Sequence, residues 1–193
     1  KRQPSRWSKN PNNLLSELVS KSGEIPIRNA VLAAMQILSQ EFVIGRNFKD
    51  INKMSGLEKE VFSFDMLGEA ARTPQQADDY FESYKSAIDE VGKINTERNL
   101  SNGVSIKISA LHPRYEMRKI NQVESELLPK LKELVNYAQS KDVEITIDAE
   151  EQDRLSLSLH IIEKLAYGKN IRDWPGFGIA LQAYGKRSFD VIH

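Results

Sequence analysis

The chain has 193 residues, of which 40% are hydrophobic, enough for one sizeable globular domain or a large part of one. Its 27 basic side chains balance 27 acidic ones, so no overall charge favours nucleic acid or an anionic membrane. Cysteine is absent, which excludes disulfides and thiolate metal sites and fits a reducing compartment, and no apolar run approaches the roughly 20 residues of a membrane span.

Residues 1–60 are predicted to be helical. Asn10 and Pro11 are typical of a helix start, and a proline opens a second helix with a broad apolar face at residues 26–43. We expect an N-terminal segment of arm or linker helices, followed by a separate domain over residues 61–193. Both ends of the chain look cut, so we expect a segment of a longer protein.

A strand pattern followed by a helix pattern recurs four times after this segment. The predicted strands cover residues 61–67, 103–111, 143–149 and 176–184. Such alternation is typical of an α/β fold with a parallel sheet covered by helices. A complete four-stranded open sheet fits, and so does the first half of a TIM-like (βα)8 barrel, whose full length is typically about 250 residues. The cut C-terminus favours the half barrel.

The helix boundaries carry their own signals. Thr73 is the predicted N-cap of the helix after the first strand, with Gln76 closing a capping box and Gly92 ending the helix. The next helix has Asn121 as its predicted cap and is expected to bend at Pro129.

Each predicted strand has one bulky apolar face and one small or polar face, because side chains alternate along a strand. We expect the apolar face to pack on helices and the other to face the barrel interior. Near the C-terminal strand ends that inner face carries Asp65, Lys107, Asp148 and Gln182. Burying unpaired charges costs several kcal/mol each, so these residues favour a ligand in the barrel mouth, where such barrels place their active sites. A buried Lys–Asp structural network with water is the alternative.

The acidic run after the third strand divides by position. Asp148 lies on the inner parity of the strand. Glu150, Glu151 and Asp153 are explained by the start of a helix, whose dipole favours acids by about 0.3–1 kcal/mol. His112 fits a site or a loop-ordering role equally. No spacing of histidines and acids predicts a metal site, and the common phosphate-binding and nucleophile motifs are absent.

Four segments, "SFDMLGEAA", "SIKISALHPRYE", "ITIDAEEQDRL" and "LQAYGKR", together resemble the proline dehydrogenase domain of the proline utilization A flavoenzymes. The likeness runs from about residue 14 to the end, with the motifs in order and at matching intervals. It implies a distorted (βα)8 barrel that holds FAD at the C-terminal strand ends. It also implies oxidation of L-proline to Δ1-pyrroline-5-carboxylate by hydride transfer to flavin, with electrons passed to a quinone.

The resemblance assigns catalytic roles. The family's catalytic lysine matches Lys107, which would lie beside the flavin and help to bind the proline carboxylate. The active-site aspartate matches Asp148. An acidic pair at the end of the first strand matches Asp65 and Glu69, and in the family that glutamate pairs with a substrate-binding arginine.

The cofactor-binding residues are assigned in the same way. Lys107 and Asp148 would contact the flavin side of the site, and Gln182 matches a glutamine that hydrogen-bonds the flavin. The backbone around Ala149 and Ala180 would flank the isoalloxazine ring.

The chain departs from the family pattern because it stops before the fifth strand. The family's flavin-phosphate residues and the arginines that clamp the substrate carboxylate lie beyond, so we expect residues 1–193 alone to be inactive. For the full-length protein the resemblance implies a cytoplasmic homo-oligomer with peripheral association at the inner membrane. Nucleic-acid binding is not evident in this segment.

Two other classes of function stay open at this stage. A lysine on an inner barrel strand near acids also suits a Schiff-base enzyme of the aldolase type. A non-catalytic helical scaffold is suggested by the amphipathic helices before residue 60. Borohydride trapping of substrate on Lys107 would favour the first, and the absence of flavin from the longer protein would favour the second.

Overall fold

A computed structural model describes residues 24–39, 43, 45 and 60–192 of the chain. The chain divides into two compact units, residues 1–54 and 55–193. In the first unit, α2 (Glu24–Ser39) confirms the predicted helix with the broad apolar face. The predicted helix start at Asn10 lies outside the described residues. Every helix within the described ranges is too short or too polar to cross a bilayer.

The second unit is built on a parallel four-stranded sheet, which confirms the predicted α/β class. Its strands are β1 (Ser63–Asp65), β2 (Gly103–Ile106), β3 (Glu144–Ile147) and β4 (Phe177–Ile179). They pair in chain order, β1-β2-β3-β4, and all three pairings are parallel. The C-terminal ends of all four strands therefore meet at one edge of the sheet.

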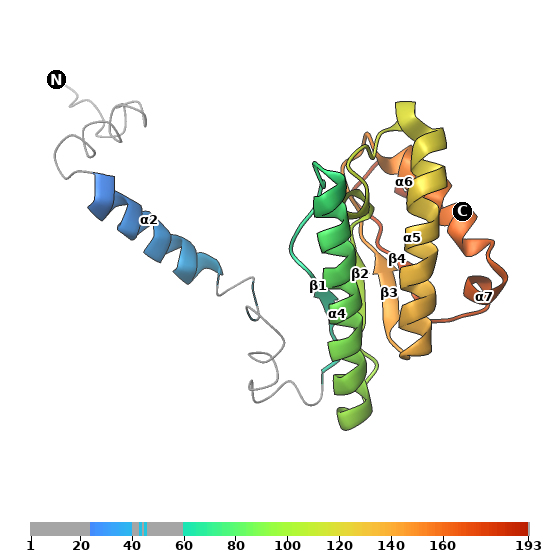
Figure 1. The fold of residues 1–193 in the computed structure, drawn as a ribbon, viewed down its shortest axis with the longest axis horizontal. Coiled ribbons are helices and arrows are strands. Elements are labelled where there is room, and N and C mark those ends of the chain that lie inside the picture. The colour runs from blue at the N-terminus through green and yellow to red at the C-terminus, as the bar shows by residue number, and fades with distance from the viewer. Residues whose placement is uncertain (1–23, 40–42, 44, 46–59, 193) are drawn as a thin grey trace, which may run out of the picture. The chain divides into compact units, whose positions relative to one another are not determined.

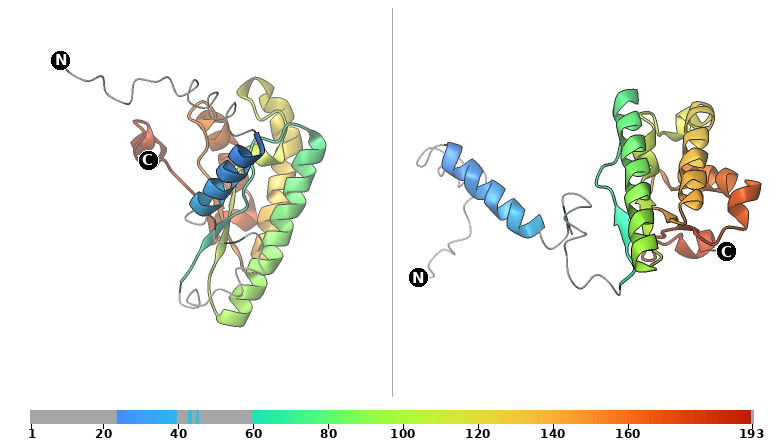
Figure 2. Two further views of the ribbon diagram at one scale, coloured as in Figure 1. Left: turned by 90° about the vertical axis from the view of Figure 1, so that its left-hand side faces the viewer. Right: turned by 60° about the horizontal axis from the view of Figure 1, so that its bottom comes forward.

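Helices cross back between successive strands (Figure 1). The three long ones are α4 (Pro74–Arg98), α5 (Ile120–Ser140) and α6 (Leu155–Ala166). Short helical segments lie in the connections: η2 (Ile108–Leu111), η3 (Met117–Lys119) and α7 (Lys169–Arg172). A further short helix, α8 (Ser188–Ile192), follows β4. Figure 2 shows α4 and α5 side by side, and they contact β2 and β3 respectively.

The apolar strand faces form the core with these helices. Val104, Ile106, Ile145 and Ile147 are at most 1% exposed, as the alternation of side chains predicts. The opposite face is more open, because Ser105 and Thr146 are half-buried and Glu144 is exposed, although Gly103 is buried. The fourth strand differs, since its apolar residue Ile179 is 38% exposed at the sheet edge.

The predicted end of the helix after the first strand is corrected. Gly92 does not end α4, which continues to Arg98 and is capped by Asn99 in the left-handed conformation, with φ of 54°. Gly92 is buried instead, and a Cβ there would lie 3.3 Å from the carbonyl oxygen of Lys141. The glycine therefore permits close packing of α4 on the turn that follows α5, a tertiary contact that local sequence does not reveal.

Of the two predicted N-caps, Thr73 is confirmed and Asn121 is wrong. Thr73 is the N-cap of α4, and its hydroxyl accepts a hydrogen bond from the backbone N–H of Gln76 at 3.1 Å. The Gln76 side chain turns to the N–H of Arg72 at 2.9 Å, so the reciprocal half of the capping box is shifted by one residue. Asn121 is not a cap, because η3 leads directly into α5 at Ile120, and α5 continues through Pro129.

Candidate functional site

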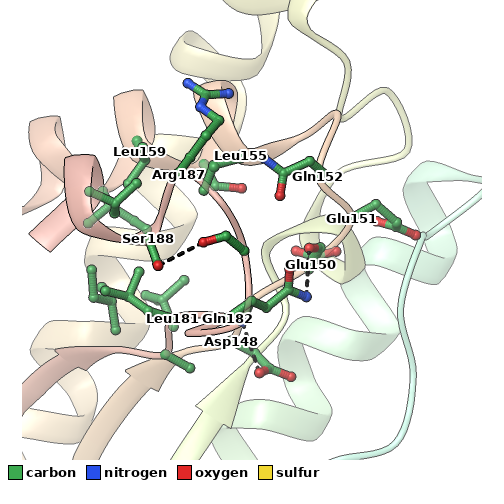
Figure 3. A pocket seen from close by; sticks show the side chains of 18 residues that line it. Asp148, Glu150, Glu151, Gln152, Leu155, Leu159, Leu181, Gln182, Arg187 and Ser188 are labelled. Atoms are coloured by element: carbon green, nitrogen blue, oxygen red, sulfur yellow. Dashed lines mark hydrogen bonds between the residues drawn. The ribbon is translucent and has the colours of Figure 1, made fainter.

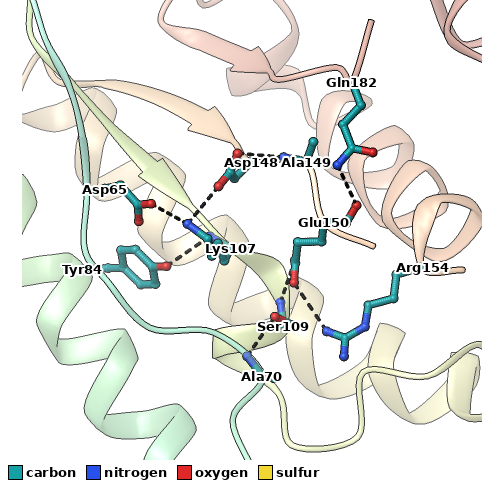
Figure 4. A network of polar contacts seen from close by, with 10 residues as sticks. All are labelled: Asp65, Ala70, Tyr84, Lys107, Ser109, Asp148, Ala149, Glu150, Arg154 and Gln182. Carbon is teal, nitrogen blue, oxygen red and sulfur yellow. Dashed lines mark hydrogen bonds and ion pairs between the residues drawn. The ribbon is translucent and has the colours of Figure 1, made fainter. Parts of the chain in front are cut away.

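Three charged side chains meet where β1, β2 and β3 end (Figure 4). The ammonium of Lys107 lies 2.6 Å from Oδ2 of Asp65 and 2.9 Å from Oδ2 of Asp148. The lysine side chain is 14% exposed, whereas those of Asp65 and Asp148 are 40% and 28% exposed. We call these three residues the Lys107 cluster. Because two carboxylates flank one ammonium, the cluster has a formal charge of −1.

The sheet and α4 together hold Lys107 in place. Asp65 is the last residue of β1, and the N–H of Asp148 extends the ladder by donating to the carbonyl of Ile106 at 2.9 Å. The Lys107 N–H does not join this ladder and donates to the hydroxyl of Tyr84, a residue of α4, at 3.1 Å. The backbone on either side of the lysine is therefore fixed by two different layers of the fold.

Electrostatics keep Lys107 protonated. Burial of the Lys107 ammonium works to lower its pKa, but hydrogen bonds to Asp65 and Asp148 raise it by more, so the pKa lies above the usual 10.5. Tyr84 has a pKa raised to about 12, chiefly because its phenol is buried. Both groups hold their protons at neutral pH.

A pocket opens beside the cluster, between the segments that follow β3 and β4 (Figure 3). It encloses about 620 Å³ of empty space, part of which is open to solvent. Four predicted site residues line it: Asp148, Ala149, Ala180 and Gln182. Leu155, Leu159 and Val191 add apolar surface, and Arg187 adds a cation. Asp148 thus borders both the pocket and the ammonium of Lys107.

Glu69, predicted from the resemblance, lies apart from this arrangement. It is exposed in the loop between β1 and α4, and it belongs neither to the Lys107 cluster nor to the pocket lining. The neighbouring Gly68 and Ala70 both have positive φ, 146° and 50°, so the loop turns sharply on each side of it. The structure therefore brings together six of the seven predicted site residues.

Glu150 is the residue whose place the sequence interpretation missed. Its side chain is 4% exposed, and Oε1 accepts the backbone N–H of Ser109 at 3.0 Å. Helix α6 begins five residues later, at Leu155, so a helix-start role does not describe Glu150. Continued strand parity would have found it, since Glu150 stands two residues after Asp148 just as Ser109 stands two after Lys107.

His112 orders the loop after β2. Its side chain is 4% exposed, Nδ1 accepts the N–H of Arg114 at 3.1 Å, and Nε2 lies 3.1 Å from a carboxylate oxygen of Glu126. An accepting Nδ1 places the proton of a neutral ring on Nε2, facing Glu126. Both ring nitrogens are then engaged locally. In the described parts of the chain no three histidines and acids are grouped to hold a metal ion.

The arrangement suits a small amphoteric ligand. An ammonium at the strand ends attracts a carboxylate, and the two flanking aspartates favour an amine nearby. The adjoining pocket, with apolar walls and one side-chain amide, suits a larger planar group in contact with that ligand. The site thus offers adjacent places for a substrate and a cofactor.

Comparison with known proteins shows the family to which the chain belongs. The family model described as proline dehydrogenase matches residues 48–193. The bifunctional protein PutA of Escherichia coli K12 is 43% identical over 183 residues, which is 92% of this chain, and that of Rhizobium meliloti is 40% identical over 176 residues. The chain spans 14% of the length of each of these curated relatives.

Solved structures give the same relationship. A mutant of proline utilization A from Bradyrhizobium japonicum superposes with a TM-score of 0.73 at 38% identity, over all of this chain and 20% of that one. The enzyme from Bdellovibrio bacteriovorus, inactivated by N-propargylglycine, superposes with a TM-score of 0.77 at 20% identity and so supports the fold alone. Its match covers 95% of this chain and 21% of that one.

Proposed function

This chain belongs to the proline dehydrogenase family, and on that premise we propose that it forms part of an FAD-dependent enzyme that oxidises L-proline to Δ1-pyrroline-5-carboxylate. The observation that carries the proposal is the Lys107 cluster at the mouth of the pocket, with the ammonium 2.6 Å and 2.9 Å from two carboxylates. Membership of the family supports proline as the substrate, since the relatives are proline utilization proteins.

Lys107 and Asp148 have distinct roles in this proposal. The ammonium of Lys107 anchors the proline carboxylate as a point charge. Asp148 lies close enough to the same ammonium to orient the ring nitrogen of that substrate. Oxidation removes a hydride from the ring carbon and a proton from the nitrogen, and a C=N bond forms between them. The amine must be neutral when the hydride leaves. The carboxylate of Asp148 is therefore placed to position the amine and to receive its proton.

The residues of the pocket fit FAD. Ala149 and Ala180 are small enough to let a flat ring approach the backbone, and Gln182 offers both a donor and an acceptor. Leu155 and Leu159 provide apolar walls. When bound, the flavin supplies the two-electron acceptor, and the protein supplies orientation and charge. Quinone as the onward acceptor, peripheral membrane association, a homo-oligomer and a cytoplasmic location belong to the same proposal.

The Schiff-base alternative is disfavoured by the charge on Lys107. An imine-forming lysine needs a neutral amine at working pH, which enzymes obtain by lowering its pKa. Here the pKa is raised by the hydrogen bonds to two aspartates. Borohydride reduction in the presence of substrate should therefore leave Lys107 unmodified.

Visible absorption of the protein that carries this segment tests the proposal directly. We expect flavin bands that bleach when L-proline is added without oxygen. A protein that lacks flavin, or whose flavin stays oxidised with L-proline, contradicts it.

Two substitutions test the assigned roles in the same protein. Lys107→Ala should raise the KM for L-proline about 10- to 100-fold, because hydrogen bonds to charged groups contribute about 1.5–3 kcal/mol. Asp148→Ala should lower kcat or the bound flavin. Lys164→Ala and Asp173→Ala are the matched controls, since neither residue lines the pocket or belongs to the cluster. Unchanged kinetics from both site variants would remove these residues from the mechanism.

A further inference from the structure

A row of hydrogen bonds crosses the segments that follow all four strands (Figure 4). The hydroxyl of Ser109 accepts the N–H of Ala70 at 3.0 Å, and its carbonyl accepts that of Ala71. Glu150 accepts the Ser109 N–H, also at 3.0 Å. The Gln182 side-chain amide then donates to the Glu150 carbonyl at 3.3 Å. We call Ala70, Ser109, Glu150 and Gln182 the outer row.

Glu150 is the link on which this row depends. Its carboxylate joins the segment after β3 to that after β2, and its own carbonyl joins it to the segment after β4. The side chain is 4% exposed, and Arg154 is a distant partner at 3.5 Å. Burying a carboxylate is unfavourable unless it is paired and hydrogen-bonded, and the bonds to Ser109 and Arg154 supply these partners.

The outer row stands in fixed relation to the Lys107 cluster. Ser109 follows Lys107 by two residues, and Glu150 follows Asp148 by two, so each segment carries one cluster residue and one row residue. A bond between Ser109 and Glu150 therefore holds Lys107 and Asp148 in register beyond the point where β2 and β3 end at Ile106 and Ile147. Through Gln182 the same link reaches the far wall of the pocket.

We propose that Glu150, which also borders the pocket, is a positioning residue that acts through Ser109 and Gln182 to set the geometry between the Lys107 cluster and the pocket. This inference rests on the proposed function. Misplacing a reacting group by about 1 Å can cost about 100-fold in rate, so a residue that fixes two strand ends affects turnover through the groups it positions.

The test uses four variants of the protein that carries this segment. Glu150→Ala removes the acceptor for the Ser109 N–H. Glu150→Asp keeps the charge but withdraws it by one methylene group, and serves if the alanine variant does not fold. Glu150→Gln keeps an oxygen for Ser109 and loses the charge. Asp153→Ala is the matched control, an exposed acid nearer to the start of α6 at Leu155.

We expect Glu150→Ala and Glu150→Asp to lower kcat for L-proline about 10- to 100-fold, more than they raise KM. Both should alter the visible circular dichroism of the bound flavin. Glu150→Gln should stay within about threefold of wild type, because the bond to Ser109 is retained. In flavin-free protein, hydrogen exchange of the peptide that contains Ser109 should be faster in Glu150→Ala than in wild type.

Three results would overturn the inference. They are wild-type kinetics in the alanine and aspartate variants, a glutamine variant as impaired as the alanine one, and an equal loss in Asp153→Ala, which would restore the helix-start explanation. Failure of the proposed function is distinguishable from all three, because wild-type protein would then show no bleaching with L-proline.

Discussion

Tyr84 shows how a residue outside the candidate site shapes it. The side chain is 1% exposed within the core, yet its hydroxyl accepts the N–H of Lys107, the residue that carries the central charge. The phenol hydroxyl and the backbone N–H that form this bond are both uncharged. The bond therefore positions the backbone of Lys107.

Tyr84→Phe should lower the free energy of unfolding by about 1–3 kcal/mol, because it leaves the Lys107 N–H without its acceptor. The KM for L-proline should rise as the lysine loses its backbone restraint. Urea denaturation and steady-state kinetics measure the two effects. Tyr167→Phe, at a tyrosine that is 70% exposed, should change neither. If Tyr84→Phe leaves both quantities at their wild-type values, the hydroxyl has no positioning role.

The raised pKa of Lys107 makes a prediction about pH. A base whose pKa is raised by folding stabilises the native state fully below its ordinary pKa, here 10.5, and loses that contribution only as pH rises through the higher folded value. The difference in unfolding free energy between wild type and Lys107→Met should therefore be constant from about pH 7 to pH 10 as far as Lys107 titration is concerned. Urea denaturation at each pH measures this difference. If the difference declines between pH 7 and pH 10, the lysine loses its proton at a lower pH than expected.

Strand parity found Asp65, Lys107 and Asp148, because a period of two places a side chain on a face whatever the rest of the fold does. The same parity, carried two residues further, would also have pointed to Glu150. Glu150 was assigned to a helix start because local sequence shows an acid before a helix and does not show the neighbouring strand that its carboxylate reaches.

At the scale of elements, the opposite ends of the strands are tied by a different set of contacts. Asn95, near the end of α4, is 7% exposed and exchanges hydrogen bonds with Asn102 at 2.8–3.0 Å. Asn102 accepts the N–H of Phe62 at 2.8 Å, just before β1. This network joins a helix end to two strand starts. It lies at the N-terminal face of the strands, where barrels of this class place stability rather than catalysis.

Asn95→Ala should lower the free energy of unfolding by about 1–3 kcal/mol, since it leaves buried polar groups of Asn102 without partners. The KM for L-proline should not change, because the site lies at the other strand ends. Asn136→Ala, on the exposed side of α5, should stay within about 0.5 kcal/mol of wild type. A large change in KM with unchanged stability would reverse this division between the two ends.

The sequence predicts the type of each element, helix or strand, better than its length. All four strands fall within their predicted ranges, and long helices follow the first three strands as predicted, because apolar periodicity is set by burial. The structure has shorter strands than predicted. β2 stops at Ile106, and the 3-10 helix η2 begins two residues later, within the range predicted as strand. The turn there serves the Tyr84 and Glu150 contacts, which are tertiary and invisible to periodicity.

At the scale of the molecule, the four βα units place the site at one edge of a sheet whose second face is open. Asp65 is 40% exposed and Asp148 28% exposed, so the charges of the Lys107 cluster still face water. A single ammonium shared with two carboxylates holds a substrate carboxylate weakly. Fold class was readable from the βα alternation, whereas the choice between an open sheet and a barrel needed the relationship to known structures.

Residues 1–193 expressed alone should therefore show no proline:dye oxidoreductase activity, because the cluster is solvated and a substrate carboxylate finds one shared cation there. Dye reduction under saturating L-proline and added FAD measures this. The longer protein assayed beside it is the control. Measurable turnover by the 193-residue chain would show that the four units suffice.

The pairing of β1 to β4 in chain order has a consequence for how the molecule is made. Each strand finds its partner in the unit synthesised just before it, so the sheet can extend one unit at a time behind the ribosome. At every stage the newest strand presents an unpaired row of N–H and C=O groups, with β4 in that position among the described residues. The growing edge is at once the template for the next strand and the surface most exposed to pairing with a neighbouring nascent chain.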